Sequence, residues 1–88
     1  MNTKFIDELA QVIISLENKE VAKAFLKNIL TPGELEEISK RLQIVKLLKN
    51  GVSQRKVAQK LNVSIGTVSR GSRELKYGAS GFNQILGC

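Results

Sequence analysis

Residues 51–76 read G-V-S-Q-R-K-V-A-Q-K-L-N-V-S-I-G-T-V-S-R-G-S-R-E-L-K, and this stretch predicts two short helices joined by a tight turn. The first helix covers residues 54–61, where Val57, Ala58 and Leu61 recur at the three-and-four spacing of one helix face. Asn62 comes next, and asparagine tolerates the left-handed backbone conformation that can follow a helix.

The second helix covers residues 65–76, and Ser64 is a good N-cap for it. Its inner side is formed by residues at helical spacing, which are Ile65, Val68, Gly71 and Leu75. Two short helices joined in this way, with the small Ala58 where they cross, predict a helix-turn-helix at about residues 54–76.

The opposite face of this unit carries basic and short polar side chains that suit DNA. Lysine and arginine can contact phosphates, whereas the first residues of the second helix can meet base edges in the major groove. Backbone contacts are expected from Arg55, Lys56 and Lys60. Base-edge contacts, direct or through ordered water, are expected from Ile65, Gly66, Thr67 and Ser69. The expected DNA-binding set is completed by Gln54, Ser64 and Arg73. An ordinary helical hairpin with a basic surface is the alternative interpretation.

The net charge of +6 is concentrated in the half of the chain that contains this unit. Residues 1–44 carry six basic and seven acidic side chains, a net charge of −1. Residues 45–88 carry eight basic side chains and one acidic side chain, Glu74, a net charge of +7. This distribution is typical of a nucleic-acid-binding domain. An acidic membrane surface could attract the same charge, but no basic amphipathic helix with large aromatic residues is evident.

The chain is expected to form a single domain, residues 1–88. It has one cysteine, Cys88, and no histidine, so an intrachain disulfide is impossible, and zinc sites and histidine-based catalysis are excluded. We therefore expect neither an enzyme nor a metal cofactor. No apolar run is long enough for a membrane span, and the N-terminus lacks a signal-peptide pattern. Together with the cysteine usage, this predicts a cytoplasmic protein.

The remaining sequence predicts four further helices and no strand, which gives an all-α fold of six helices. These helices span residues 3–16, 19–30, 32–50 and 81–86. The clearest start is Thr31-Pro32-Gly33-Glu34, a capping box with proline at the first helical position. Other caps are expected at Asn18, Ser53 and Ser80, and Gly51 is expected to end the third helix.

The first, second and last of these helices carry apolar stripes that are expected to be core or dimer interface. One chain of 88 residues is too short to cover all of them, which favours a homodimer. A dimer would also hold two recognition helices at a fixed spacing on a palindromic site.

Three motifs carry a resemblance to a known family: L-T-P-x-E at residues 30–34, S-Q-R at residues 53–55, and S-I-x-T-[VI]-[ST]-R-G-S at residues 64–72. The chain resembles the tryptophan repressor family, including its repressor-like relatives of unassigned regulon, from about Phe5 to Leu86. The resemblance implies an intertwined, all-helical homodimer whose helix-turn-helix binds a double-stranded DNA operator. It therefore implies a sequence-specific transcriptional repressor.

In the Trp-dependent members of this family, L-tryptophan is the corepressor and sits between the third and fifth helices. The resemblance places Arg41 and Arg70 on either side of the indole plane, and guanidinium groups stack well on aromatic rings. It also implies that Thr31 and the carbonyl of Leu30, contributed by the partner chain, meet the amino-acid end of the ligand. Gly71 would leave room for the ring.

Each of these ligand residues also has an interpretation without a ligand. Arg41 could pair with Glu37, four residues earlier on the same helix. Arg70 could contact a phosphate, and Gly71 could mark an early helix end.

Two positions depart from the Trp-dependent pattern. Glu74 stands where a serine is usual, and Asn28 stands where a leucine is usual. A carboxylate at position 74 could repel the tryptophan carboxylate or bind its amino group. The first hypothesis is thus a dimeric repressor with L-tryptophan as corepressor, and the second is a ligand-independent DNA-binding regulator. A helical protein–protein adaptor with a basic face for an acidic partner is the third.

Overall fold

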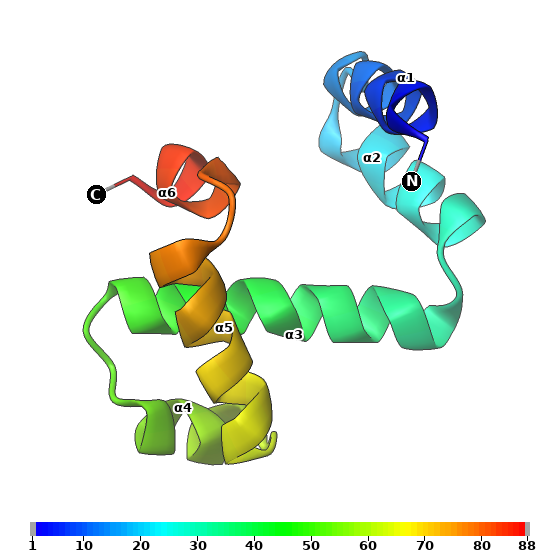
Figure 1. Cartoon of the computed structure of the whole chain (residues 1–88). Coiled ribbons are helices and arrows are strands. Elements are labelled where there is room, and N and C mark those ends of the chain that lie inside the picture. Colours follow the sequence, from blue (N-terminus) through cyan, green and yellow to red (C-terminus); the bar gives the residue numbers. More distant parts are fainter. Residues whose placement is uncertain (1, 88) are drawn as a thin grey trace. The chain divides into compact units, whose positions relative to one another are not determined.

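The computed structural model describes residues 2–87, and within this range the chain forms six α-helices and no strand (Figure 1). The helices are α1 (Thr3–Ile14), α2 (Lys19–Ile29), α3 (Pro32–Lys49), α4 (Gln54–Leu61), α5 (Ile65–Tyr77) and α6 (Gly81–Leu86). The all-helical prediction is confirmed, and five of the six helices end within one residue of the predicted position. The first ends two residues early, where the N–H of Ser15 donates to the carbonyls of Val12 and Ile13. Cys88 lies outside the described residues.

Side-chain caps fix the starts of several helices, as predicted. At α3 the N–H of Glu34 donates to Thr31 Oγ1 at 3.2 Å, and the N–H of Thr31 donates to Glu34 Oε1 at 2.8 Å. This reciprocal pair satisfies two amides that the helix itself leaves without acceptors. Asn18 caps α2 by accepting from the N–H of Val21 at 2.9 Å, and Ser53 caps α4 by accepting from the N–H of Lys56 at 3.3 Å.

The predicted cap at Ser80 is wrong. Its side chain accepts no hydrogen bond from an amide of α6, and its Oγ instead accepts from Nε2 of Gln84 at 2.6 Å. An N-cap side chain reaches the helix amides from an extended backbone, whereas Ser80 has φ −78° and ψ 0°.

The chain divides into two compact units, the first ending at Leu35 and the second beginning at Glu36. The first unit contains α1, α2 and the opening turn of α3, and none of its described residues is buried. Its apolar side chains are instead widely exposed, and those of α1 include Phe5, Ile6, Leu9, Val12, Ile13 and Ile14. Without a surface to cover them, these side chains gain little of the stabilisation that burial provides.

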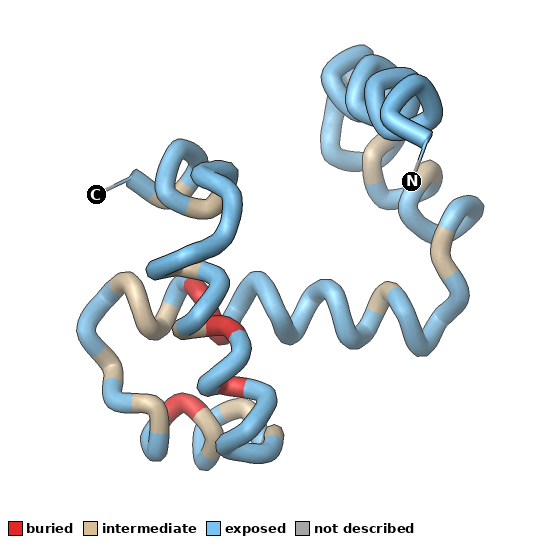
Figure 2. Tube along the Cα trace, viewed as in Figure 1, coloured by how far each residue is buried: buried red, intermediate tan, exposed pale blue. Residues whose placement is uncertain are grey.

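The second unit contains the small core of the molecule, built where α3, α4 and α5 meet (Figure 2). Ile44 of α3, Val57 of α4 and Val68 of α5 are at most 1% exposed. Burying side chains of this size contributes about 1.5–3 kcal/mol each. The partly buried residues around them are Leu47, Leu48, Val52, Ala58, Leu61 and Val63.

A glycine allows α5 to pack closely against α3. Gly71 is buried, and a Cβ placed on it would lie 2.9 Å from Cγ2 of Ile44 and 3.9 Å from Cδ1 of Leu48. Any larger residue would therefore require the Ile44 side chain or the α5 backbone to shift. Glycine weakens a helix locally, and this close approach of α5 to α3 explains why one stands inside α5.

Ile65 departs from the predicted inner side of α5, because it is 54% exposed. The helix contacts the core through Val68 and Gly71, and Ile65 at its first position is not among the residues packed there. The inner face of α5 therefore begins one turn later than the spacing alone predicts.

The substitution Gly71→Ala is expected to lower the free energy of unfolding by about 1–3 kcal/mol, because the added methyl group overpacks the contact with Ile44. Gly66→Ala on the same helix is the matched control, since its new Cβ would meet only Ser64 Oγ, at 3.8 Å. That control is expected to leave stability unchanged or raise it by up to about 1 kcal/mol. Urea unfolding at one protein concentration measures both, and equal destabilisation by the two variants would contradict the close α3–α5 approach.

Candidate nucleic-acid interface

A three-residue turn, residues 62–64, sets the orientation of α5 relative to α4. Asn62 adopts the left-handed conformation (φ 54°, ψ 50°), and its N–H donates to the carbonyl of Ala58. The N–H of Val63 donates to the same carbonyl at 3.1 Å, and the Val63 side chain packs on the core. The turn is thus fixed by its own hydrogen bonds and by an apolar contact, and the left-handed conformation expected at Asn62 is confirmed.

The start of α5 presents polar groups that already hold one another in place. The N–H of Thr67 donates to Ser64 Oγ at 3.1 Å, which confirms Ser64 as the N-cap. The hydroxyl groups of Ser64 and Thr67 also share a hydrogen bond of 2.8 Å. A Cβ placed on Gly66, between them in sequence, would meet only Ser64 Oγ, at 3.8 Å. The first turn of α5 is therefore narrow, polar and exposed.

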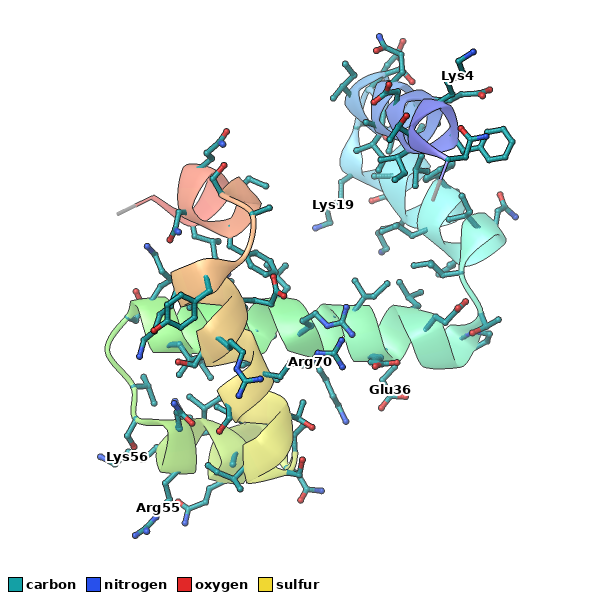
Figure 3. All side chains as sticks on the ribbon, viewed as in Figure 1. Lys4, Lys19, Glu36, Arg55, Lys56 and Arg70 are labelled. Atoms are coloured by element: carbon teal, nitrogen blue, oxygen red, sulfur yellow. The ribbon has the colours of Figure 1, made fainter. Side chains whose placement is uncertain are left out.

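The residues predicted to bind DNA lie on the outer surface of α4 and α5. Gln54 is half-buried and the others are exposed: Arg55, Lys56, Lys60, Ser64, Ile65, Gly66, Thr67, Ser69 and Arg73. Arg55 and Lys56 extend outward from the first turn of α4, whereas Arg70 projects from α5 (Figure 3). The buried residues Val57, Val68 and Gly71 belong to the opposite side of the same helices.

One hydrogen bond joins the two outer faces. Ser69 Oγ donates to Oε1 of Gln54 at 2.8 Å, across 15 positions of sequence. Sequence reasoning assigned both residues to the DNA-binding face but did not foresee that they contact each other. No local signal could have found this contact, because it depends on how α4 and α5 cross.

The basic groups of this surface are not neutralised by neighbours. In the described part of the chain, ion pairs join Lys40 to Glu36 at 3.4 Å and Arg41 to Glu37 at 3.3 Å, both along α3. Across residues 2–87, the lysines and arginines of α4 and α5 make no ion pair, so their charge is available to an anionic partner.

The residues predicted to bind a ligand fall in both units. In the second unit Arg41 pairs with Glu37, Arg70 is exposed on α5, and Ile44 packs against Gly71. Glu74, one of the two departures from the Trp-dependent pattern, curls toward the end of its own helix, where it lies against Gly78. The Arg41–Glu37 pair expected from their spacing along α3 is therefore present.

In the first unit Thr31 is occupied in capping α3, and Leu30 is half-buried. Leu30 lines an open pocket of about 320 Å³ together with Lys27, Pro32 and Leu35. Asn28, the second departure, is exposed on α2.

Sequence reasoning also missed a polar clasp that fastens α6. Nζ of Lys49 donates to Oδ1 of Asn83 at 2.9 Å, and Nδ2 of Asn83 donates to the carbonyl of Leu75 at 3.3 Å. One amide therefore ties α6 to the ends of both α3 and α5. The clasp lies outside the predicted DNA-binding set.

The described residues contain neither a membrane-spanning helix nor a cluster of metal-ligating side chains. No helix within 2–87 is long and apolar enough to cross a membrane. The same residues contain no group of three or more acidic, cysteine or histidine side chains that could hold a metal ion.

Comparison with known families gives one match over nearly the whole chain. The family model described as Trp repressor protein matches residues 4–87, which include α2 to α6 and all of α1 except Thr3.

Relatives with similar sequences occur in several bacteria. A Trp operon repressor homolog from Vibrio campbellii is 37% identical over 70 residues, covering 78% of this chain and 70% of that protein. A Trp operon repressor homolog from Mannheimia succiniciproducens is 44% identical over 75 residues, covering 84% and 70%. The uncharacterized protein YerC from Bacillus subtilis is 29% identical over 83 residues, covering 94% and 80%.

A solved structure is also similar. The crystal structure of a TrpR-like protein from Eubacterium eligens superposes with a TM-score of 0.88 at 29% sequence identity, covering 94% of this chain and 86% of that one. The fold is therefore similar to one that has been determined experimentally.

Proposed function

Because this chain belongs to the Trp repressor family, we propose that it is a sequence-specific DNA-binding transcriptional repressor that uses α4 and α5 as a helix-turn-helix. The observation that carries the proposal is the two-sided character of this unit. Its inner side is closed by Val57, Val68 and Gly71, whereas its outer side is exposed, basic and free of ion pairs within residues 2–87.

The two helices would contact different parts of the DNA. Arg55 and Lys56 at the start of α4 point outward, where they would contact phosphates and orient the unit on the duplex. The first turn of α5 offers the Thr67 hydroxyl and the bare backbone of Gly66, which would enter the major groove and meet base edges. Affinity would come largely from the first set and sequence preference from the second.

Replacing Arg55 with alanine is expected to weaken binding to every DNA sequence by a similar factor. The slope of log affinity against log salt should become shallower by about 0.9 for each phosphate that the variant no longer neutralises. Fluorescence anisotropy with a duplex enriched from a random pool, and with a scrambled duplex of the same composition, measures both quantities.

The control is Lys19→Ala, which removes an exposed cation from α2, outside the proposed surface. It should leave the salt slope unchanged. An Arg55→Ala protein with the wild-type slope would rule out the phosphate contact.

We also propose that the protein acts as a homodimer joined through its first unit. The apolar face of α1 is exposed in the single chain, with Leu9 and Val12 at 40% and 39%. A second copy offers the same face in a self-complementary arrangement, as twofold symmetry requires. The dimer would hold two copies of α5 at one spacing, which suits two successive half-sites.

The substitution Leu9→Glu is expected to weaken dimerisation by about tenfold or more, since it places a carboxylate in an apolar interface. Gln11→Glu adds the same charge at a polar position of the same helix and should have little effect. Sedimentation equilibrium measures both constants. A wild-type protein that stays monomeric at all concentrations would argue against the dimer.

The ligand part of the proposal is that L-tryptophan is the corepressor. Arg41 and Arg70 belong to α3 and α5, which pack together in the second unit, and their planar guanidinium groups suit an indole ring. A specific observation favours the alternative, a ligand-independent regulator of the same family. Arg41 is already paired with Glu37, and Glu74 brings a carboxylate to α5.

Titration with L-tryptophan is expected to give saturable binding at one ligand per chain. The protein contains no tryptophan and one tyrosine, so ligand fluorescence can be followed with little background. Arg70→Ala should weaken binding about tenfold if its guanidinium stacks on the ring, whereas Arg73→Ala on the same helix should not.

Lack of saturable binding would overturn the corepressor proposal and leave the ligand-independent regulator. Equal weakening by both arginine variants would point to a general charge effect and would contradict the stacking role of Arg70.

A further inference from the structure

We propose that the Ser69 hydroxyl is a positioning group that holds the Gln54 side chain against α5, so that the phosphate-contacting end of α4 and the base-facing side of α5 bind DNA as one unit. The inference rests on the proposed DNA binding and deepens it. It assigns Ser69 a role that acts through Gln54, in place of the direct base contact expected from sequence.

The geometry joins two points whose backbones the core already fixes. Ser69 directly follows Val68, which is fully buried. Gln54 is the first residue of α4, three positions before the buried Val57, so the same short helix holds its backbone in place. The hydrogen bond of 2.8 Å between their side chains therefore connects rigid positions, and it bridges the two helices on the exposed side of the unit.

The position of Ser69 on α5 explains why this contact matters for recognition. Ser69 lies four residues after Ile65 and three after Gly66, so the three share the helix face proposed to meet base edges. Gln54 is followed by Arg55 and Lys56, whose side chains extend toward solvent. The bond thus spans from the phosphate-contacting residues to the base-facing residues.

The Gln54 amide keeps binding capacity after this contact is made. A glutamine side chain has two N–H donors besides its carbonyl oxygen, and Ser69 uses only the oxygen. Among the hydrogen bonds of residues 2–87, neither N–H of Gln54 has a partner. These donors are available to a phosphate oxygen or a base acceptor, and fixing the side chain in advance lowers the entropic cost of binding.

The test is a double-mutant cycle on DNA affinity, using wild type, Gln54→Ala, Ser69→Ala and the double variant. Alanine is the best helix former, so both helices should be retained, and circular dichroism with urea unfolding checks this. The probes are a labelled duplex enriched from a random pool by the wild-type protein and a scrambled duplex of equal composition.

We expect each single variant to weaken binding to the enriched duplex roughly fivefold, the effect of one hydrogen bond. The double variant should be weakened by about the same factor rather than by the product of the two, because both changes remove one shared contact. Ser69→Thr, which keeps a hydroxyl, should restore most of the affinity. The ratio of the affinity for the enriched duplex to that for the scrambled duplex should fall by a similar factor.

Asn83→Ala is the matched control, since it also removes a hydrogen bond between helices but lies outside the proposed DNA surface. It should lower stability without changing the affinity ratio. If Asn83→Ala lowers the ratio as Ser69→Ala does, the effect is merely structural and the positioning role is overturned.

Multiplicative effects in the cycle would show that Ser69 and Gln54 act on DNA independently, and single variants with wild-type affinity would show that neither matters. Either result overturns the inference while the proposed DNA binding stands. If the wild-type protein enriches no sequence from the pool, the proposed function fails and the inference fails with it.

Discussion

The second unit depends on the close contact between α5 and α3 at Gly71. Because residue 71 has no side chain, the backbone of α5 reaches the methyl groups of Ile44, and Val68 is drawn into the same core. This contact fixes which side of α5 is closed. The opposite side, with Ser69 and Arg73, is therefore presented to solvent by packing on the interior. In the proposed DNA-binding role, recognition would therefore depend on a packing contact to which none of the proposed DNA-facing residues contributes.

The helices were predictable because their signals are local. The Thr31–Glu34 capping pair, the left-handed Asn62 and the Ser64 cap each operate within four residues, so sequence spacing is enough to find them. The cap predicted at Ser80 was wrong because a cap also depends on backbone geometry that the serine itself does not set. A serine caps only if the chain before it arrives extended, and that backbone angle is set by the preceding turn rather than by the serine.

The residues that form the candidate surface could be predicted from the sequence, but the contacts among them could not. Helical periodicity assigns Arg55, Lys56 and Thr67 to an outer face wherever the partner helix lies. The bond from Ser69 to Gln54 and the clasp from Lys49 to Asn83 join residues 15 and 34 positions apart. Such contacts follow from the crossing of whole helices, which a helical repeat in the sequence does not encode. Ile65 was assigned both to the inner side of α5 and to the base-facing set, and its exposure contradicts the first of these assignments.

The separation of the two faces of α5 has an evolutionary consequence. Ile65, Gly66 and Thr67 make no contribution to the buried core, so exchanging them alters fold stability little. If these residues meet base edges as proposed, gene duplication followed by drift at these positions could yield paralogues with new operators at little cost in stability. Gly71 is under the opposite steric constraint, because even an added Cβ would lie 2.9 Å from Cγ2 of Ile44. The proposed base-facing residues could thus change while the packing of the core stays the same.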